Sequence, residues 1–178
     1  MIRTRVGYGG GQTTSPTYRN IGDHTETVQI DYDPKRISYD QLLEIFWSSH
    51  GPTRPSISRQ YMKVVFYHNE QQRKQAMASI IALQNTTGSI VRTEIAPIRS
   101  FTMAEDYHQK FTLKRHNGFT NEMTRIYPRH QDFVDSTAAA RLNGYLGGHG
   151  SRDQLLKEIV SLGLSPEAEK MLTDMIRR

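Results

Sequence analysis

The 178-residue chain contains no cysteine. It therefore cannot form a disulfide, a thiolate metal site or a thiol nucleophile from its own residues. Any fold that it adopts must therefore be stabilised without disulfide cross-links. A chain of this length buries enough apolar surface for one domain, or for one domain with a tail.

The net charge of +5 is spread along the chain. Lys and Arg are mixed with Asp and Glu in both halves, which argues against a basic stripe of the kind that binds nucleic acid or a membrane surface. Neither a transmembrane-length apolar run nor a signal-peptide core after Arg3 and Arg5 is visible. The sequence predicts a cytoplasmic protein without a nucleic-acid or membrane partner.

A short strand-like run over residues 1–6 precedes a segment rich in glycine and turn residues, 7–20. Glycines of this kind bind phosphate where a strand precedes them and a helix begins at the last glycine. Residues 13–16 disfavour a helix at that point. We therefore interpret the glycines as a tight backbone turn.

Hydrophobic periodicity predicts alternating strands and helices as far as residue 113. Val28, Ile30 and Tyr32 alternate with polar residues, which predicts a strand over 26–32 with these side chains on its buried face. The patterns also predict helices over 39–49, 69–84 and 104–113 and strands over 61–68 and 90–96. The inner side of the second helix is expected to carry Ala76, Met77, Ile80 and Ile81. This order predicts an α+β fold, a two-layer mixed sheet with packed helices.

The remainder of the chain divides into two parts. Residues 115–150 are polar and rich in His, Arg and Gly, which predicts a long irregular excursion on the surface. Residues 152–162 have helical spacing, and Ser165-Pro166-Glu167 begins a final helix with an N-cap, an N1 proline and a first-turn acid. We expect a domain over 1–113, an irregular extension over 114–150 and a C-terminal helical hairpin over 151–178.

Several polar residues are candidates for chemistry by their position alone. They are Tyr18, His24, Glu26, Tyr61, Glu94, Glu105, Asp106, Tyr107 and His108. On a strand, residues 24 and 26 share one face, which suits an acid and a neighbour that tunes it, although an edge-of-sheet salt bridge or a solvated pair is the better explanation of the spacing alone.

Two other groups of side chains are better explained by a structural role than by a binding site. The four adjacent polar residues 105–108 point in different directions on one helical turn, so no metal site is expected there. Phe46 and Trp47 fit a hydrophobic core better than a binding platform.

Considered together, the motifs of the chain resemble those of one family. In order they are Arg5-Val6-Gly7-Tyr8-Gly9-Gly10-Gly11, Pro16-Thr17-Tyr18, Gly22-Asp23-His24-Thr25-Glu26, Tyr32-Asp33-Pro34, Ile37-Ser38-Tyr39, Phe46-Trp47-Ser48-Ser49-His50, Arg59-Gln60-Tyr61, Thr93-Glu94-Ile95-Ala96-Pro97 and residues 101–109. This collinear set resembles the class A peptide methionine sulfoxide reductases over residues 2–111. Residues 138–150 resemble the C-terminal extension of animal-type members.

The resemblance implies a function and a set of site residues. Members have a ferredoxin-like core and reduce the S epimer of methionine sulfoxide, free or in oxidised proteins, in a reaction that belongs to protein repair. On this resemblance Glu26 is the general acid, and Tyr18 and Tyr61 are the phenol donors to the sulfoxide oxygen. A carboxylic acid buried beside aromatic rings would remain protonated near neutral pH. No bound cofactor or metal is implied; thioredoxin would be the external reductant, and a monomer is expected.

The chain departs from the family pattern in two places. The family's nucleophile lies in a Gly-Cys-Phe-Trp motif at the end of the first strand, and this chain has neither the motif nor a cysteine elsewhere. Gly51-Pro52-Thr53 also lacks the Asp that many members have before the proline, and the loop up to Arg59 is short.

Three hypotheses account for the missing nucleophile. The chain is a piece of a longer protein, for example where a selenocysteine codon has been read as a stop; it is a non-catalytic relative that binds methionine sulfoxide or a protein; or it is a degraded product without a stable fold. Under each of them, we expect the 178 residues alone to be inactive as a reductase.

Overall fold

The computed structural model describes residues 1–176. By its internal contacts the chain divides into two compact units. One contains residues 1–5, 29–31 and 105–178, and the other contains residues 6–28 and 32–104. None of the helices in the described range has the length and apolarity that a transmembrane helix requires.

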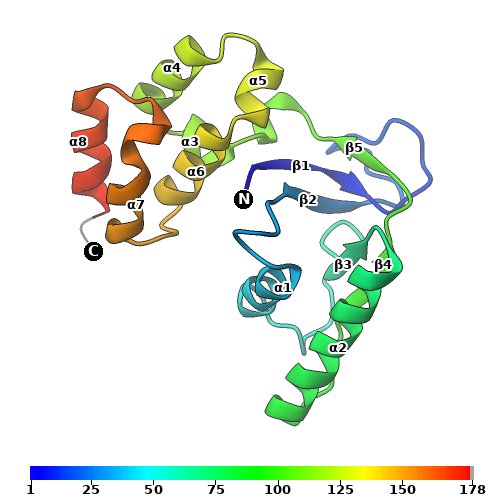
Figure 1. Ribbon diagram of the computed structural model, residues 1–178. Coiled ribbons are helices and arrows are strands. Elements are labelled where there is room, and N and C mark those ends of the chain that lie inside the picture. Colours follow the sequence, from blue (N-terminus) through cyan, green and yellow to red (C-terminus); the bar gives the residue numbers. More distant parts are fainter. Residues whose placement is uncertain (177–178) are drawn as a thin grey trace. The chain divides into compact units, whose positions relative to one another are not determined.

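The α+β class is confirmed (Figure 1). The strands are β1 (Arg3–Gly9), β2 (Thr25–Asp31), β3 (Val64–Tyr67), β4 (Glu94–Pro97) and β5 (Phe101–Met103). The α-helices are α1 (Tyr39–Ser48), α2 (Glu70–Thr87), α3 (Phe111–Lys114), α4 (Asn117–Ile126), α5 (His130–Asp135), α6 (Thr137–Leu146), α7 (Arg152–Glu158) and α8 (Pro166–Met175). Two 3₁₀ helices are η1 (Asp106–His108) and η2 (Ile159–Leu162).

The strands form two small sheets. One has the order β2-β1-β5, with β1 antiparallel to β5 and Gly7 opposite Met103. The other is a parallel pair, β3 and β4, in which Val64 lies opposite Glu94. Residues 104–113, expected as one helix, instead form η1 and the start of α3, because Lys110 adopts a left-handed backbone conformation between them.

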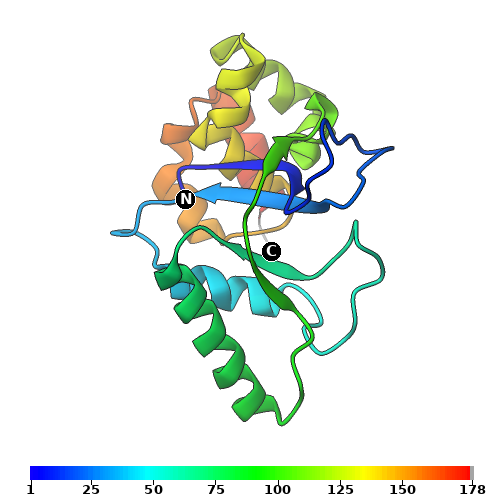
Figure 2. The same cartoon turned by 90° about the vertical axis from the view of Figure 1, so that its right-hand side faces the viewer.

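Helices α1 and α2 pack beside β3 and β4 around Leu43, Trp47 and Ala76 (Figure 2). Both helices begin within one residue of the predicted position, and α2 ends three residues later than expected, at Thr87. Ser38 forms the capping box with Gln41 at the start of α1, and the side chain of Asn69 caps α2. The indole Nε1 of Trp47 donates to the hydroxyl of Ser79, which lies on α2, at 3.0 Å. Phe46 and Trp47 thus belong to this core, as expected.

Two predicted buried faces are wrong in part. On β2, Val28 is 56% exposed and Ile30 is also exposed, whereas Thr25, on the opposite face, is buried. On α2, Met77 and Ile81 are exposed while Ala76 is buried. Alternation identifies which side chains share a face, but the elements that pack against the strand or helix decide which face is covered.

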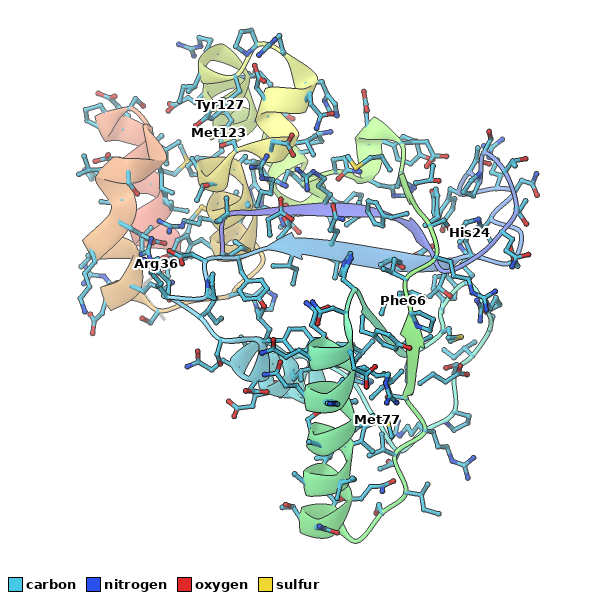
Figure 3. All side chains as sticks on the ribbon, turned by 45° about the vertical axis from the view of Figure 1, so that its right-hand side comes forward. His24, Arg36, Phe66, Met77, Met123 and Tyr127 are labelled. Carbon is cyan, nitrogen blue, oxygen red and sulfur yellow. The ribbon has the colours of Figure 1, made fainter. Side chains whose placement is uncertain are left out.

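The expected irregular excursion over residues 115–150 is also wrong, because most of it is helical. Helices α4, α5 and α6 contribute Phe119, Met123, Phe133, Val134 and Leu142 to the larger hydrophobic core (Figure 3). Each helix is short and the breaks between them are polar, so the apolar positions do not produce a long periodic pattern.

The C-terminal helical hairpin is confirmed. It consists of α7, its 3₁₀ continuation η2, and α8, which begins at Pro166 with the side chain of Ser165 as its N-cap. Glu158, at the end of α7, accepts a hydrogen bond from the Tyr145 hydroxyl at 2.6 Å and pairs with Arg141 at 2.7 Å. The carboxylate of Glu158 thereby joins the hairpin to α6, because Arg141 and Tyr145 both belong to that helix.

The same unit contains a buried lysine. The Nζ of Lys110 donates to the backbone oxygen of Thr4 at 2.5 Å and to its hydroxyl at 3.2 Å. Burial lowers the pKa of Lys110 from its ordinary 10.5 to about 8, and the charges of Arg5 and Lys114 act in the same direction, while Asp135 opposes them.

Stability should therefore depend on pH through Lys110. Because the folded chain favours the neutral amine, the unfolded chain binds more protons between about pH 8 and 10.5, and the free energy of unfolding rises with pH over that window. Relative to Lys110→Met, the wild-type chain should gain about 3 kcal/mol between about pH 7.5 and about pH 10.5 in urea denaturation. The exposed Lys157→Met is the control and should show no such gain; a constant difference between wild type and Lys110→Met would contradict the expectation.

Candidate functional site

Tyr18 lies at the corner of a tight turn. Thr17 and Asn20 exchange backbone hydrogen bonds at 3.2 and 3.1 Å, so that Tyr18 and Arg19 are the two residues between them. The side chain of Tyr18 is 40% exposed. The turn thus holds a phenol and a guanidinium next to each other at the surface.

Asp23 fixes the loop that carries this turn. Its carboxylate accepts hydrogen bonds from the backbone N–H groups of Gln12 and Thr13 and from the Thr13 hydroxyl, at 2.7 to 3.0 Å. These bonds, first among them those from Thr13, hold the pKa of Asp23 well below its usual range. Asp23 is therefore ionised at neutral pH, and its stabilising bonds to the loop are lost only in strong acid.

His24 holds the same loop from inside (Figure 3). It is 1% exposed; its Nε2 lies 2.8 Å from the backbone oxygen of Thr13, and its Nδ1 accepts from the N–H of Gly11 at 3.3 Å. Because the carbonyl can only accept, the proton must be on Nε2, which fixes the neutral tautomer. His24 is thus joined to backbone groups of the loop, and the structure does not pair it with Glu26 as the shared-face hypothesis required.

Glu26 is positioned by a second segment of the chain. The N–H of Glu26 donates to the backbone oxygen of Gln60 at 3.0 Å, and the Thr25 hydroxyl donates to the backbone oxygen of Arg59 at 3.0 Å. In the reverse direction, Nε of Arg59 donates to the backbone oxygen of Asp23 at 2.8 Å. These bonds align residues 23–26 with residues 59–61.

The carboxylate of Glu26 accepts a hydrogen bond at 2.8 Å from the side-chain amide of Gln60. Gln60 was not among the predicted site residues, although it lies directly before Tyr61 in the Arg59-Gln60-Tyr61 motif. The Glu26 side chain is exposed, so the expected burial beside aromatic rings is wrong for the described chain. The reason is that β2 places it on the uncovered face that also bears Val28.

The two predicted phenols meet beside this carboxylate. A side-chain hydrogen bond joins Tyr18 and Tyr61, and this bond, partial desolvation and the charges of Tyr18 and Glu26 raise the pKa of Tyr61 above its ordinary value. Tyr61 is 48% exposed. The structure therefore brings Tyr18, Glu26 and Tyr61 together at an open surface, where the phenols can donate to a polarised oxygen and the Glu26 carboxyl group, in its protonated form, can supply a proton.

The other polar candidates lie elsewhere. Glu105, Asp106, Tyr107 and His108 belong to the other unit, where His130 pairs with Asp106 at 3.0 Å. Glu94 is an exposed residue at the start of β4. Among residues 1–176, no group of three or more His, Asp or Glu side chains is arranged to bind a metal ion.

Comparison with known proteins places the chain in one family. The profile of the family described as peptide methionine sulfoxide reductase matches residues 1–142. A peptide methionine sulfoxide reductase of Drosophila melanogaster is 43% identical over 169 residues, covering 93% of this chain and 67% of that protein. Peptide methionine sulfoxide reductase A5 of Arabidopsis thaliana is 40% identical, covering 82% of this chain and 59% of that protein.

Solved structures show the same relationship. Reduced Mxr1 from Saccharomyces cerevisiae superimposes with a TM-score of 0.59 at 27% identity, covering 64% of this chain and 71% of that one. Methionine sulfoxide reductase A of Corynebacterium diphtheriae gives a TM-score of 0.54 at 28% identity, covering 64% of this chain and 63% of that one. The chain thus spans between 59% and 71% of the length of these four proteins.

The loop over residues 11–23 should be destabilised by a side chain larger than that of glycine at position 11. A Cβ on Gly11 would lie 2.6 Å from the His24 ring and from Oδ1 of Asp23. We expect Gly11→Ala to lower the free energy of unfolding by about 1–3 kcal/mol. The control Gly144→Ala, on α6 with no atom within 4 Å of the new Cβ, should raise it by about 0.5–1 kcal/mol. Equal effects in urea denaturation would show that the His24 ring does not limit the space at Gly11.

Proposed function

Because the chain belongs to the peptide methionine sulfoxide reductase family, we propose that it binds methionine S-sulfoxide, free or in oxidised proteins, at Tyr18, Tyr61 and Glu26. The observation that carries this proposal is the hydrogen bond between the two phenols beside an exposed carboxyl group. A sulfoxide presents a strongly polarised oxygen and no donor, which is complementary to a pair of O–H donors.

The tyrosines act as donors to the sulfoxide oxygen. A tyrosine hydroxyl is protonated at neutral pH, and the pKa of Tyr61 is shifted further upward, so it remains a donor. Both tyrosines are exposed, and the turn at Thr17–Asn20 positions the backbone of Tyr18. Binding would replace the bond between the two phenols with bonds from each to the substrate oxygen.

Glu26 supplies a proton to that oxygen. Reduction of a sulfoxide consumes two electrons and two protons and yields a thioether and water, so an acid must act at the oxygen while a reductant acts at the sulfur. The amide of Gln60 orients the carboxyl group by its bond to Oε1. The chain thus provides oxygen recognition and proton supply.

The electrons must come from a nucleophile that the 178 residues do not contain, since they include no cysteine. We propose that a thiolate or selenolate supplied outside these residues attacks the sulfur, and that thioredoxin regenerates it. The family membership supports both points. A monomeric state is proposed on the same ground, and the cysteine-free composition is compatible with the proposed cytoplasmic location.

Binding should depend on the two phenols. Tyr18→Phe and Tyr61→Phe each remove one donor and should weaken the binding of a methionine S-sulfoxide peptide about two- to tenfold in calorimetry. Tyr107→Phe is the control, because Tyr107 is similarly exposed, at 57%, but lies in the other unit. Unchanged affinity in both site variants would remove the phenols from the proposed role.

Turnover should require the missing nucleophile. The 178-residue polypeptide with dithiothreitol should form no methionine above a protein-free control, whereas a hybrid that adds a family segment with the Gly-Cys-Phe-Trp motif should do so. In the hybrid, Glu26→Gln should slow the reductive step by about 10²-fold or more while binding changes little. Turnover by the chain alone, or equal loss of rate and binding in Glu26→Gln, would contradict the proposal.

A further inference from the structure

The segments that form the site carry an excess of positive charge. Between residues 12–26 and 51–63 there are four basic and two acidic side chains. They are Arg19, Arg54, Arg59, Lys63, Asp23 and Glu26. Backbone hydrogen bonds from Arg92 to Pro52 and from Glu94 to Lys63 place one further charge of each sign beside these segments. The site is therefore more basic than the rest of the chain, in which the two signs are nearly balanced.

Hydrogen bonds hold two of these cations without neutralising them. Lys63 Nζ donates to the backbone oxygens of Gly51 and Arg54 at 2.8 and 3.0 Å. Arg59 donates to the backbone oxygen of Asp23 and to the sulfur of Met62. Carbonyl oxygens and a thioether carry no formal charge, so the positive charge of both side chains remains available to a ligand.

Arg19 and Arg54 are exposed, and neither forms an ion pair within the described part of the chain. Arg19 follows Tyr18 in the tight turn, so it is the direct neighbour in sequence of one of the two proposed donors to the sulfoxide oxygen. Arg54 lies in the loop that Lys63 holds. A bound peptide would thus meet cations on both the Tyr18 side and the Tyr61 side of the site.

We propose that this basic rim gives the site a preference for methionine sulfoxide flanked by acidic residues. The inference rests on the proposed function and specifies its substrate class. The mechanism is electrostatic: Asp or Glu beside the sulfoxide gains attraction from the uncompensated cations, whereas Lys or Arg in the same places is repelled. The interaction takes place at an exposed surface, so it is moderate in size and is screened by salt.

The test uses four peptides and titration calorimetry at low and high salt. Methionine S-sulfoxide or methionine is placed between pairs of Asp or pairs of Lys. At about 20 mM salt, the acidic sulfoxide peptide should bind about fivefold or more tightly than the basic one, and most of the difference should disappear at about 0.5 M. The acidic methionine peptide should bind much more weakly than its sulfoxide.

Matched variants locate the effect. The double variant Arg19→Gln/Arg54→Gln should reduce the preference to less than about twofold. Arg36→Gln should leave it unchanged, because Arg36 follows the far end of the seven-residue β2, about 20 Å from the His24 end (Figure 3). A preference that survives the double variant, or that is lost equally in Arg36→Gln, would overturn the assignment to this rim.

The outcomes separate this inference from the proposed function. Equal binding of both sulfoxide peptides overturns the charge preference and leaves sulfoxide binding intact. If the acidic sulfoxide peptide and the acidic methionine peptide bind equally, the binding is non-specific electrostatic attraction and the sulfoxide is not recognised. This result also overturns the inference. If neither sulfoxide peptide binds, the proposed function itself fails and the inference fails with it.

Discussion

The alignment of residues 23–26 with residues 59–61 is the constraint on which the site depends. Glu26 and Tyr61 are distant in sequence. They are brought together by hydrogen bonds from Thr25 to Arg59, from Glu26 to Gln60 and, in the reverse direction, from Arg59 to Asp23. Most of these bonds use backbone atoms on at least one side. Their loss would therefore separate the acid from one of its phenols without altering either side chain.

The third component of the site, Tyr18, depends on a different set of bonds. The loop from Gly11 to Asp23 is held by an ionised carboxylate at the surface and a neutral imidazole beneath it. Asp23 and His24 belong to the aligned segment 23–26, so the same stretch of chain fixes both Tyr18 and Glu26. The site is thus rigid where it holds the oxygen donors and open where a substrate would approach.

The sequence predicted those features that are determined locally. Ser165 was found as a helix cap because capping depends on residues within one turn. The exposure of Val28 and the bond from Gln60 to Glu26 could not be predicted, since both depend on which distant segments pack together. Tyr18, Glu26 and Tyr61 were each visible as candidates, but their joint role came from the family resemblance, and the structure then placed them side by side.

The central claim is that Tyr18, Glu26 and Tyr61 form one stereospecific sulfoxide-oxygen site in a chain without its own nucleophile. An NMR titration of the 178-residue chain with the separate S and R epimers of a methionine sulfoxide peptide tests it most directly. The claim predicts saturable shifts of the Tyr18, Gln60 and Tyr61 amide resonances with the S epimer and much smaller shifts with the R epimer. Equal shifts with both epimers, or shifts confined to other residues, would contradict it.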